Sequence, residues 1–185
     1  MEWILLGLVV LLLGWLVVIY NRLVALRQGT GQAWADIEVQ LKQRHDLVPN
    51  LVETVKGYAA HERATLDAVV AARSNATRAT GPAEAAAAES VLSGALGRLF
   101  ALAEADPDLK ANQNFLSLQG ELSNVVTKIA AARRFFNNAV AEYNSAIQSI
   151  PAVFFAGTLG FGPRGFFELE AGERAAVQTA PQVKF

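Results

Sequence analysis

The chain opens with an apolar run that differs from everything after it. Eighteen consecutive residues, Trp3–Tyr20, carry no charge. As a helix, a run of this length spans about 27 Å, close to the hydrocarbon thickness of a bilayer. Trp3, Trp15 and Tyr20 lie near its ends, where aromatic rings favour the headgroup boundary. The pattern predicts a transmembrane anchor over residues 1–20.

The residues around the apolar run favour an uncleaved anchor, with a cleaved signal peptide as the alternative. A signal peptide starts with basic residues and ends at a small-residue cleavage site. This chain starts Met-Glu-Trp and continues into YNRLVALR. Gly7 and Gly14 lie on nearly the same side of the predicted helix and leave a flat strip for a second helix. We therefore predict that these two glycines pack in the membrane.

Charges next to the span predict its orientation. Only Glu2 precedes the span, whereas four basic residues follow it within 25 residues: Arg22, Arg27, Lys42 and Arg44. Basic residues accumulate on the cytoplasmic side of a membrane helix. We therefore expect a single-pass protein of the plasma membrane whose following domain lies in the cytoplasm.

Residues 21–150 repeat apolar positions at helical spacing. The first stretch alternates steps of three and four residues, apart from one step of seven across Arg44, at Trp34, Ile37, Leu41, Val48, Leu51, Val55 and Tyr58. A strict heptad comes later, at Phe115, Leu122, Ile129, Phe136, Tyr143 and Ile150. It predicts a helix of about 36 residues that ends at Pro151. Gly81-Pro82 and Asp106-Pro107 predict the breaks between helices. We predict an all-α protein with a long antiparallel helical bundle over residues 21–150.

Two interruptions in the first helical stretch each have two interpretations. The apolar stripe keeps its phase across Pro49, which favours one helix with a kink at Pro49. The alternative is a chain reversal in which Asp46 caps a new helix. Gly29-Thr30-Gly31 weakens the helix by about 1 kcal/mol per glycine. It is either a tolerated flaw or a hinge between anchor and bundle.

Polar residues beside the apolar stripe predict a structural layer. Arg44 falls on a core position, where a charge must be paired or must reach the edge. Asp46 and Asn50 lie close to it in the sequence, and Arg133 and Asn137 occupy the middle of the long helix. We predict that these five residues form a polar layer that fixes helix register. The alternative is a set of solvated side chains beside the core.

Residues 151–185 form a tail in which the helical pattern stops. Six of the ten phenylalanines lie here among glycines and prolines. A solvated disordered tail lacks aromatic residues, so these rings must pack on the bundle, on another subunit or at the lipid surface. The predicted contacts with a partner or lipid are Phe154, Phe155, Phe161, Phe166 and Phe167.

Composition and motif spacing argue against several functions. A net charge of −1 indicates no nucleic-acid partner, and the absence of cysteine removes thiolate metal sites and a cysteine nucleophile. His45 and His61 lack the spacing of a metal-binding helix pair. GFGPRG, residues 160–165, has the spacing of a dinucleotide loop but no βαβ unit around it. We predict no enzyme and no catalytic, metal or cofactor-binding residue.

Four segments together resemble the LemA family: YNRLVALR, AWADIEVQLKQRHDLVPNLVETVKGYAAHE, RRFFNNAVAEYNSAIQSIPAVFFAGTLGF and FFELEAGERAAVQTAPQVKF. RQGTGQAW departs from the family, which more often carries helix formers there. The resemblance implies a bacterial membrane protein with an antiparallel four-helix bundle and no established catalytic residue; one relative takes part in forming magnetosome membranes. A reversal at Pro49 would give four helices, at 21–45, 46–78, 83–105 and 110–150. Without it, the tail must supply the fourth helix.

We therefore expect a non-enzymatic, membrane-anchored helical scaffold that self-assembles. The expected partners are the lipid bilayer, further copies of the chain and other membrane proteins. The alternative is a membrane-surface, remodelling or adaptor protein, whose tail phenylalanines contact lipid or a membrane-protein partner.

Overall fold

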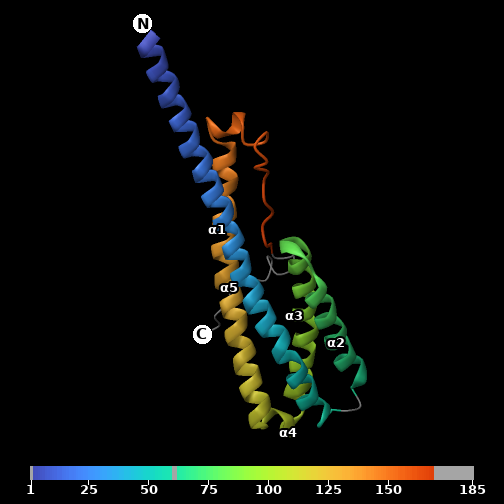
Figure 1. Ribbon diagram of the computed structural model, residues 1–185. Helices are drawn as coiled ribbons and strands as arrows, with labels where there is room; N and C mark the ends of the chain where they lie inside the picture. Colours follow the sequence, from blue (N-terminus) through green and yellow to red (C-terminus); the bar gives the residue numbers. More distant parts are fainter. Residues whose placement is uncertain (1, 60–61, 169–185) are drawn as a thin grey trace, which may run out of the picture.

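The computed structural model describes residues 2–59 and 62–168, and these residues form a long, narrow molecule (Figure 1). The helices are α1 (Glu2–Lys56), α2 (Arg63–Arg78), α3 (Gly81–Ala105), α4 (Pro107–Lys110) and α5 (Gln113–Gln148). A short 3-10 helix, η1 (Ala152–Phe154), follows α5. The described residues contain no strand, so the prediction of an all-α protein is confirmed.

Helix α1 contains both the apolar span and the first helix of the bundle, in 55 continuous residues. Its N-terminal part protrudes beyond the other helices (Figure 1), and none of its most apolar window is buried. Such exposure fits a segment that lipid surrounds. Helix α3 is also apolar enough to cross a membrane, but it is partly buried in the bundle. We therefore treat α1 as the membrane anchor.

Beyond the span, α1, α2, α3 and α5 pack as an antiparallel four-helix bundle (Figure 1). Helix α5 lies beside α1, α2 pairs with α3, and α4 links α3 to α5 at the end far from the span. The core of the lower bundle consists of aliphatic and aromatic side chains, among them Val48, Leu51, Leu92, Leu99, Phe115 and Leu122. The four-helix arrangement places the C-terminus of α5 beside the end of the span.

The first chain reversal lies between the end of α1 at Lys56 and the start of α2 at Arg63. Helix α1 runs through Pro49 to Lys56, so the favoured interpretation of one helix across Pro49 is confirmed and the alternative, a reversal at Pro49, is wrong. The helix limits derived from it, 21–45 and 46–78, are wrong for the same reason. The tail does not supply the fourth helix either, because α2 does. The sequence signal was Gly57, since glycine commonly follows the last residue of a helix.

Tyr58 illustrates why the apolar stripe concealed this turn. It continues the spacing of the stripe, yet it lies in the turn after α1 and is exposed. Its hydroxyl accepts a hydrogen bond from Asn112 Nδ2 at 2.8 Å, next to the start of α5. The tyrosine therefore joins two turns at the far end of the bundle and does not fill the core.

Capping residues set the later helix boundaries. Asp106 accepts hydrogen bonds from the backbone N–H groups of Asp108 and Leu109, at 3.0 and 3.1 Å. The Asn112 side chain accepts from the Phe115 N–H at 3.0 Å, which begins α5. The helix then runs for 36 residues. The long helix predicted from the heptad is confirmed.

The neck of the molecule, Arg27–Gly31, is an unbroken part of α1. Thr30 is completely buried. Its hydroxyl donates to the Arg27 carbonyl at 2.7 Å and accepts from Arg164 Nη1 at 2.5 Å. These contacts support the interpretation of Gly29-Thr30-Gly31 as a tolerated flaw and argue against a hinge.

Candidate functional site

Three charged or polar side chains are buried together where α1 faces α3. Arg44 and Glu89 are each only 6% exposed. Arg44 donates to Glu89 Oε2 at 2.8 Å and to Ser93 Oγ at 2.9 Å. His45 Nε2 lies 2.5 Å from the other carboxylate oxygen, Glu89 Oε1. We call Arg44, His45, Glu89 and Ser93 the ionic cluster.

Pro49 is connected to the ionic cluster through the backbone of His45. Proline has no N–H, so the carbonyl four residues earlier loses its helical partner. That carbonyl belongs to His45, and Arg73 Nε from α2 donates to it at 2.6 Å. The bond compensates for the proline and explains how α1 continues through it. It also ties α2 to the level of the ionic cluster. A change of helix direction at Pro49 stays a prediction.

The ionic cluster is built to hold helices together. Both oxygens of Glu89 are occupied by side chains of α1. Among the described residues, no group of three or more His, Cys, Asp or Glu side chains could hold a metal ion. If α1 shifted along α3, the ion pair would break and leave a buried charge uncompensated. The free-energy cost of that charge disfavours every other register of the two helices. We therefore assign the ionic cluster to the register of α1 against α3.

The predicted polar layer does not form on α1. Asp46 is exposed and pairs with Lys42, whose ammonium lowers the pKa of this carboxyl. Asn50 is also exposed. These residues follow Arg44 by two and by six positions, so they point away from the helix face that Arg44 occupies. Of the residues predicted for the layer, only Arg44 lies in the ionic cluster.

The two layer residues predicted on α5 do not reach Arg44 either. Arg133 is partly exposed, and the Asn137 side chain bonds the backbone of the tail. The partner of Arg44 is Glu89, which the sequence reasoning missed. The sequence signal that could have identified Glu89 was its position on the same helix face as the apolar residues of α3. Ala85, Glu89 and Leu92 share one buried face, and a core arginine requires an acid.

The tail runs back along the bundle as an extended segment, residues 161–168, which we call the strap (Figure 1). Asn144 of α5 exchanges two hydrogen bonds with the Arg164 backbone, both at 2.9 Å. Asn137 does the same with Phe167, at 3.1 and 2.9 Å. The two asparagines are seven positions apart, so they lie on one face of α5. Each asparagine side chain donates to a carbonyl of the strap and accepts from an N–H of the strap, as the backbone of a neighbouring strand does.

The five phenylalanines predicted to contact a partner or lipid have different environments. Phe161 is buried, and its ring lies edge-on to Tyr20 with centroids 5.6 Å apart. Phe167 is buried against Trp34, with centroids 5.8 Å apart. For these two residues the predicted contact with lipid or a partner is wrong, because their own chain covers them. The prediction stays for partly buried Phe155 and for exposed Phe154 and Phe166.

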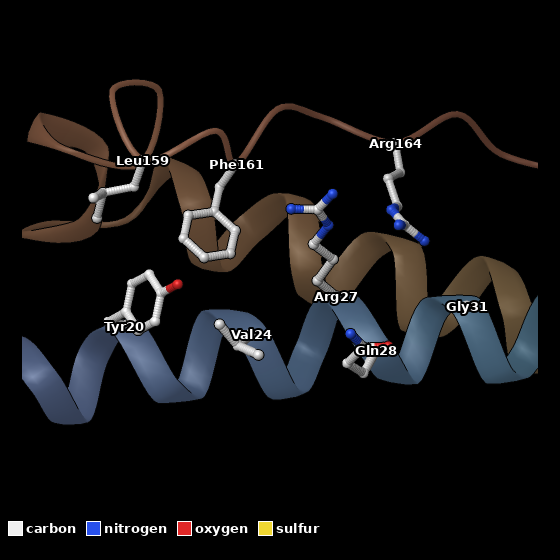
Figure 2. Close-up of a pocket in the computed structure, with 8 residues that line it drawn as sticks. All are labelled: Tyr20, Val24, Arg27, Gln28, Gly31, Leu159, Phe161 and Arg164. Carbon is white, nitrogen blue, oxygen red and sulfur yellow. The ribbon is translucent and has the colours of Figure 1, made fainter.

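A groove of about 390 Å³ separates α1 from the tail just beyond the span. Figure 2 shows its two kinds of lining. Tyr20, Phe161 and Leu159 form an apolar side, while Arg27 and Arg164 bring their guanidinium groups to the other. We call it the juxtamembrane groove. The sequence reasoning did not select either arginine as a site residue, although Arg164 lies inside the GFGPRG motif.

The span itself has no packing partner in a single chain. An added Cβ at Gly7 or Gly14 would meet no atom within 4 Å. The predicted role of these glycines in helix packing stays a prediction. His61 and residues 169–185 lie outside the described residues.

Comparison with known proteins agrees with this architecture. Residues 33–185 match the model of the LemA family. The chain is also 25% identical, over 191 aligned residues, to Magnetosome protein MamQ of Magnetospirillum gryphiswaldense. That alignment covers 89% of this chain and 70% of MamQ. The family match includes α2, α3, α5 and all residues of the ionic cluster, and the chain belongs to the LemA family.

Proposed function

We propose that this protein is a non-enzymatic scaffold that holds a helical bundle at fixed orientation to the membrane and self-assembles there. The observation that carries the proposal is the continuity of α1. One helix of 55 residues contains the span and extends to the far end of the bundle. At 1.5 Å per residue this is a rod about 80 Å long. The far end of the bundle therefore follows every movement of the anchor.

Three sets of contacts stiffen this rod. The ionic cluster joins α1 to α3, Arg73 joins α2 to α1, and the asparagines of α5 hold the strap. Buried side chains fill the remaining contacts between α1 and α5. None of these features prepares a nucleophile or an acid–base pair. They suit a protein that acts through shape and position. The basic residues after the span support a location of this rod on the cytoplasmic side of a bacterial plasma membrane.

Self-assembly through the span has a direct test in cysteine crosslinking. The chain contains no cysteine, so a single introduced thiol is the only one that can react. Gly7→Cys should form a disulfide-linked dimer in most molecules when native membranes are mildly oxidised. Val9→Cys is the matched control, because a position two residues away faces another side of the helix. Monomer alone from Gly7→Cys, or equal dimer from both variants, would contradict self-assembly through this face.

A second function, attachment to the membrane surface, is favoured by one further observation. The turn after α5 exposes four apolar side chains, with exposed fractions between 46 and 79%: Ile150, Val153, Phe154 and Leu159. We call them the apolar tip. Residues of the same turn pack against Ile19 and Leu23, where the span leaves the membrane. Apolar side chains at this level favour the boundary between headgroups and acyl chains.

The apolar tip predicts that Phe154 contacts lipid. Phe154→Cys carrying the fluorophore NBD should show blue-shifted emission in proteoliposomes and quenching by lipids with a nitroxide on the acyl chain. Val39→Cys is the control, because Val39 is as exposed as the tip residues but lies on α1 within the bundle. Emission that is identical at both positions would remove the membrane-surface function.

A further inference from the structure

We propose that the juxtamembrane groove binds the phosphate group of an anionic phospholipid, with Arg27 and Arg164 as its ligands. The chain would then hold a specific lipid beside its own anchor. The inference requires only that the span ends near Tyr20. It does not depend on self-assembly or on the scaffold role.

The described lining of the juxtamembrane groove contains two positive charges and no carboxylate. The four ion pairs among the described residues include neither Arg27 nor Arg164. Figure 2 shows the Arg27 side chain rising from α1 into the space below the strap, beside Arg164. Guanidinium groups bind phosphate oxygens through several parallel N–H donors. Two of them in one groove therefore indicate an oxyanion as the ligand.

Arg164 is held in place before any ligand arrives. Its backbone N–H and carbonyl are both bonded to Asn144, and its Nη1 donates to Thr30. The guanidinium carbon lies 5.9 Å from the centre of the Tyr143 ring. These contacts fix its direction and use only part of its N–H donors. A ligand in the groove therefore meets an arginine that loses little conformational entropy on binding.

The depth of the groove matches the phosphate layer of a bilayer. Arg27 follows Tyr20 by seven residues, so its Cα lies about 10 Å beyond the end of the span. The interfacial layer outside the hydrocarbon is about 5–8 Å thick on each side. Long basic side chains reach back towards the membrane from such positions. The Arg27 guanidinium can therefore reach the level of lipid phosphates. Arg164, whose Nη1 donates to Thr30, lies at the end of the groove farther from the span (Figure 2).

The apolar side of the groove distinguishes a lipid from a free phosphate ion. Leu159, Phe161 and Val24 line the groove together with Tyr20, and Tyr20 ends the span. A phospholipid joins its phosphate to acyl chains through glycerol, so one molecule satisfies both sides of the groove. An inorganic ion would leave the apolar side without a partner. Two cations also favour a headgroup that carries no positive charge of its own, such as phosphatidylglycerol.

Native mass spectrometry of the delipidated full-length protein in detergent tests this assignment. The protein is titrated separately with phosphatidylglycerol, phosphatidylcholine and inorganic phosphate. We expect phosphatidylglycerol to bind most tightly. Arg27→Gln should weaken its binding about fivefold, and the double variant with Arg164→Gln about twenty-five-fold, since a basic residue near the headgroups has an effect of this order. Arg22→Gln is the control and should weaken binding clearly less than Arg27→Gln, because Arg22 is exposed on the same helix outside the groove and contributes only general attraction to anionic headgroups.

Three outcomes would overturn the assignment. The first is equal affinity for phosphatidylglycerol and phosphatidylcholine. The second is an equal loss of binding in Arg22→Gln and Arg27→Gln, which would indicate general attraction to negative charge. The third is inorganic phosphate that binds as tightly as the lipid, which would make a free phosphate the ligand.

The single variant Arg27→Gln keeps these outcomes interpretable. It leaves the bond between Arg164 and Thr30 and the asparagine contacts of the strap in place. Circular dichroism should therefore show unchanged helix content. The crosslinking of Gly7→Cys, repeated with Arg27→Gln, should also be unchanged. A failure of lipid binding and a failure of self-assembly can thus be told apart.

Discussion

Glu89→Ala is expected to lower the free energy of unfolding by about 3–5 kcal/mol, because the substitution leaves a buried charge without its partner. Glu89 accepts a hydrogen bond from Arg44 and lies within bonding distance of His45. Without the carboxylate, the Arg44 guanidinium keeps only Ser93 as a partner in a site closed to solvent. Chemical denaturation of the full-length protein in detergent, followed by circular dichroism, measures the loss.

Two controls separate the loss of the ion pair from the loss of a helix side chain. Glu104→Ala removes an exposed acid from the same helix and should change the free energy of unfolding by no more than about 0.5 kcal/mol. Arg44→Met combined with Glu89→Leu removes both charges and should cost much less than Glu89→Ala alone. If Glu89→Ala is no more destabilising than Glu104→Ala, the ionic cluster does not fix the bundle.

Proline at position 29 is expected to destabilise the protein by about 3 kcal/mol or more, whereas alanine there should stabilise it by about 0.5–1 kcal/mol. The two variants are a matched pair, because an added Cβ at Gly29 meets no atom within 4 Å. Proline at position 29 would remove the helical hydrogen bond to the Ala25 carbonyl, and the proline ring would clash with that carbonyl oxygen. At Pro49 the equivalent carbonyl receives a hydrogen bond from Arg73. Denaturation followed by circular dichroism measures both changes.

The comparison between these two variants decides between a stiff neck and a hinge. A stiff neck requires Gly29→Pro to be much less stable than Gly29→Ala. Equal stability of the two variants would mean that the bundle does not depend on a continuous helix between residues 27 and 31.

The heptad pattern was sufficient to predict the helical class and the longest helix. An apolar residue every seven positions from Phe115 onward leaves no other regular structure that could bury one continuous face. Asp106 followed by Pro107 was equally informative, because the carboxylate and the missing N–H act locally. Signals of this kind are contained in a few neighbouring residues, so a single sequence shows them.

The first chain reversal was missed because two local signals competed. Pro49 is the more prominent helix breaker, but the carbonyl that it frees is bonded by Arg73, which is 28 positions from His45 in the sequence. Gly57 is the less prominent signal, and the apolar stripe continues past it to Tyr58. The hydrogen bond from Arg73 thus lets α1 continue through Pro49, whereas the helix ends at Lys56, just before Gly57.

The candidate sites required contacts between residues that are distant in the sequence. Arg44 was recognisable as a core charge, but its partner Glu89 lies 45 positions away in an alanine-rich segment. Asp46 and Asn50 were nearer in sequence and pointed the wrong way. In the juxtamembrane groove, Arg164 approaches Thr30 across 134 positions. Only the folded strap brings Arg164 beside Arg27.

The distance between spin labels at Val17→Cys and Val39→Cys in proteoliposomes tests most directly whether anchor and bundle form one rod. Both positions are exposed on α1, and the chain has no other cysteine. Pulsed electron paramagnetic resonance should give one narrow distribution centred near about 33 Å, the rise of a continuous helix over this separation. A broad distribution, or a second population at shorter distance, would contradict the rod and restore the hinge.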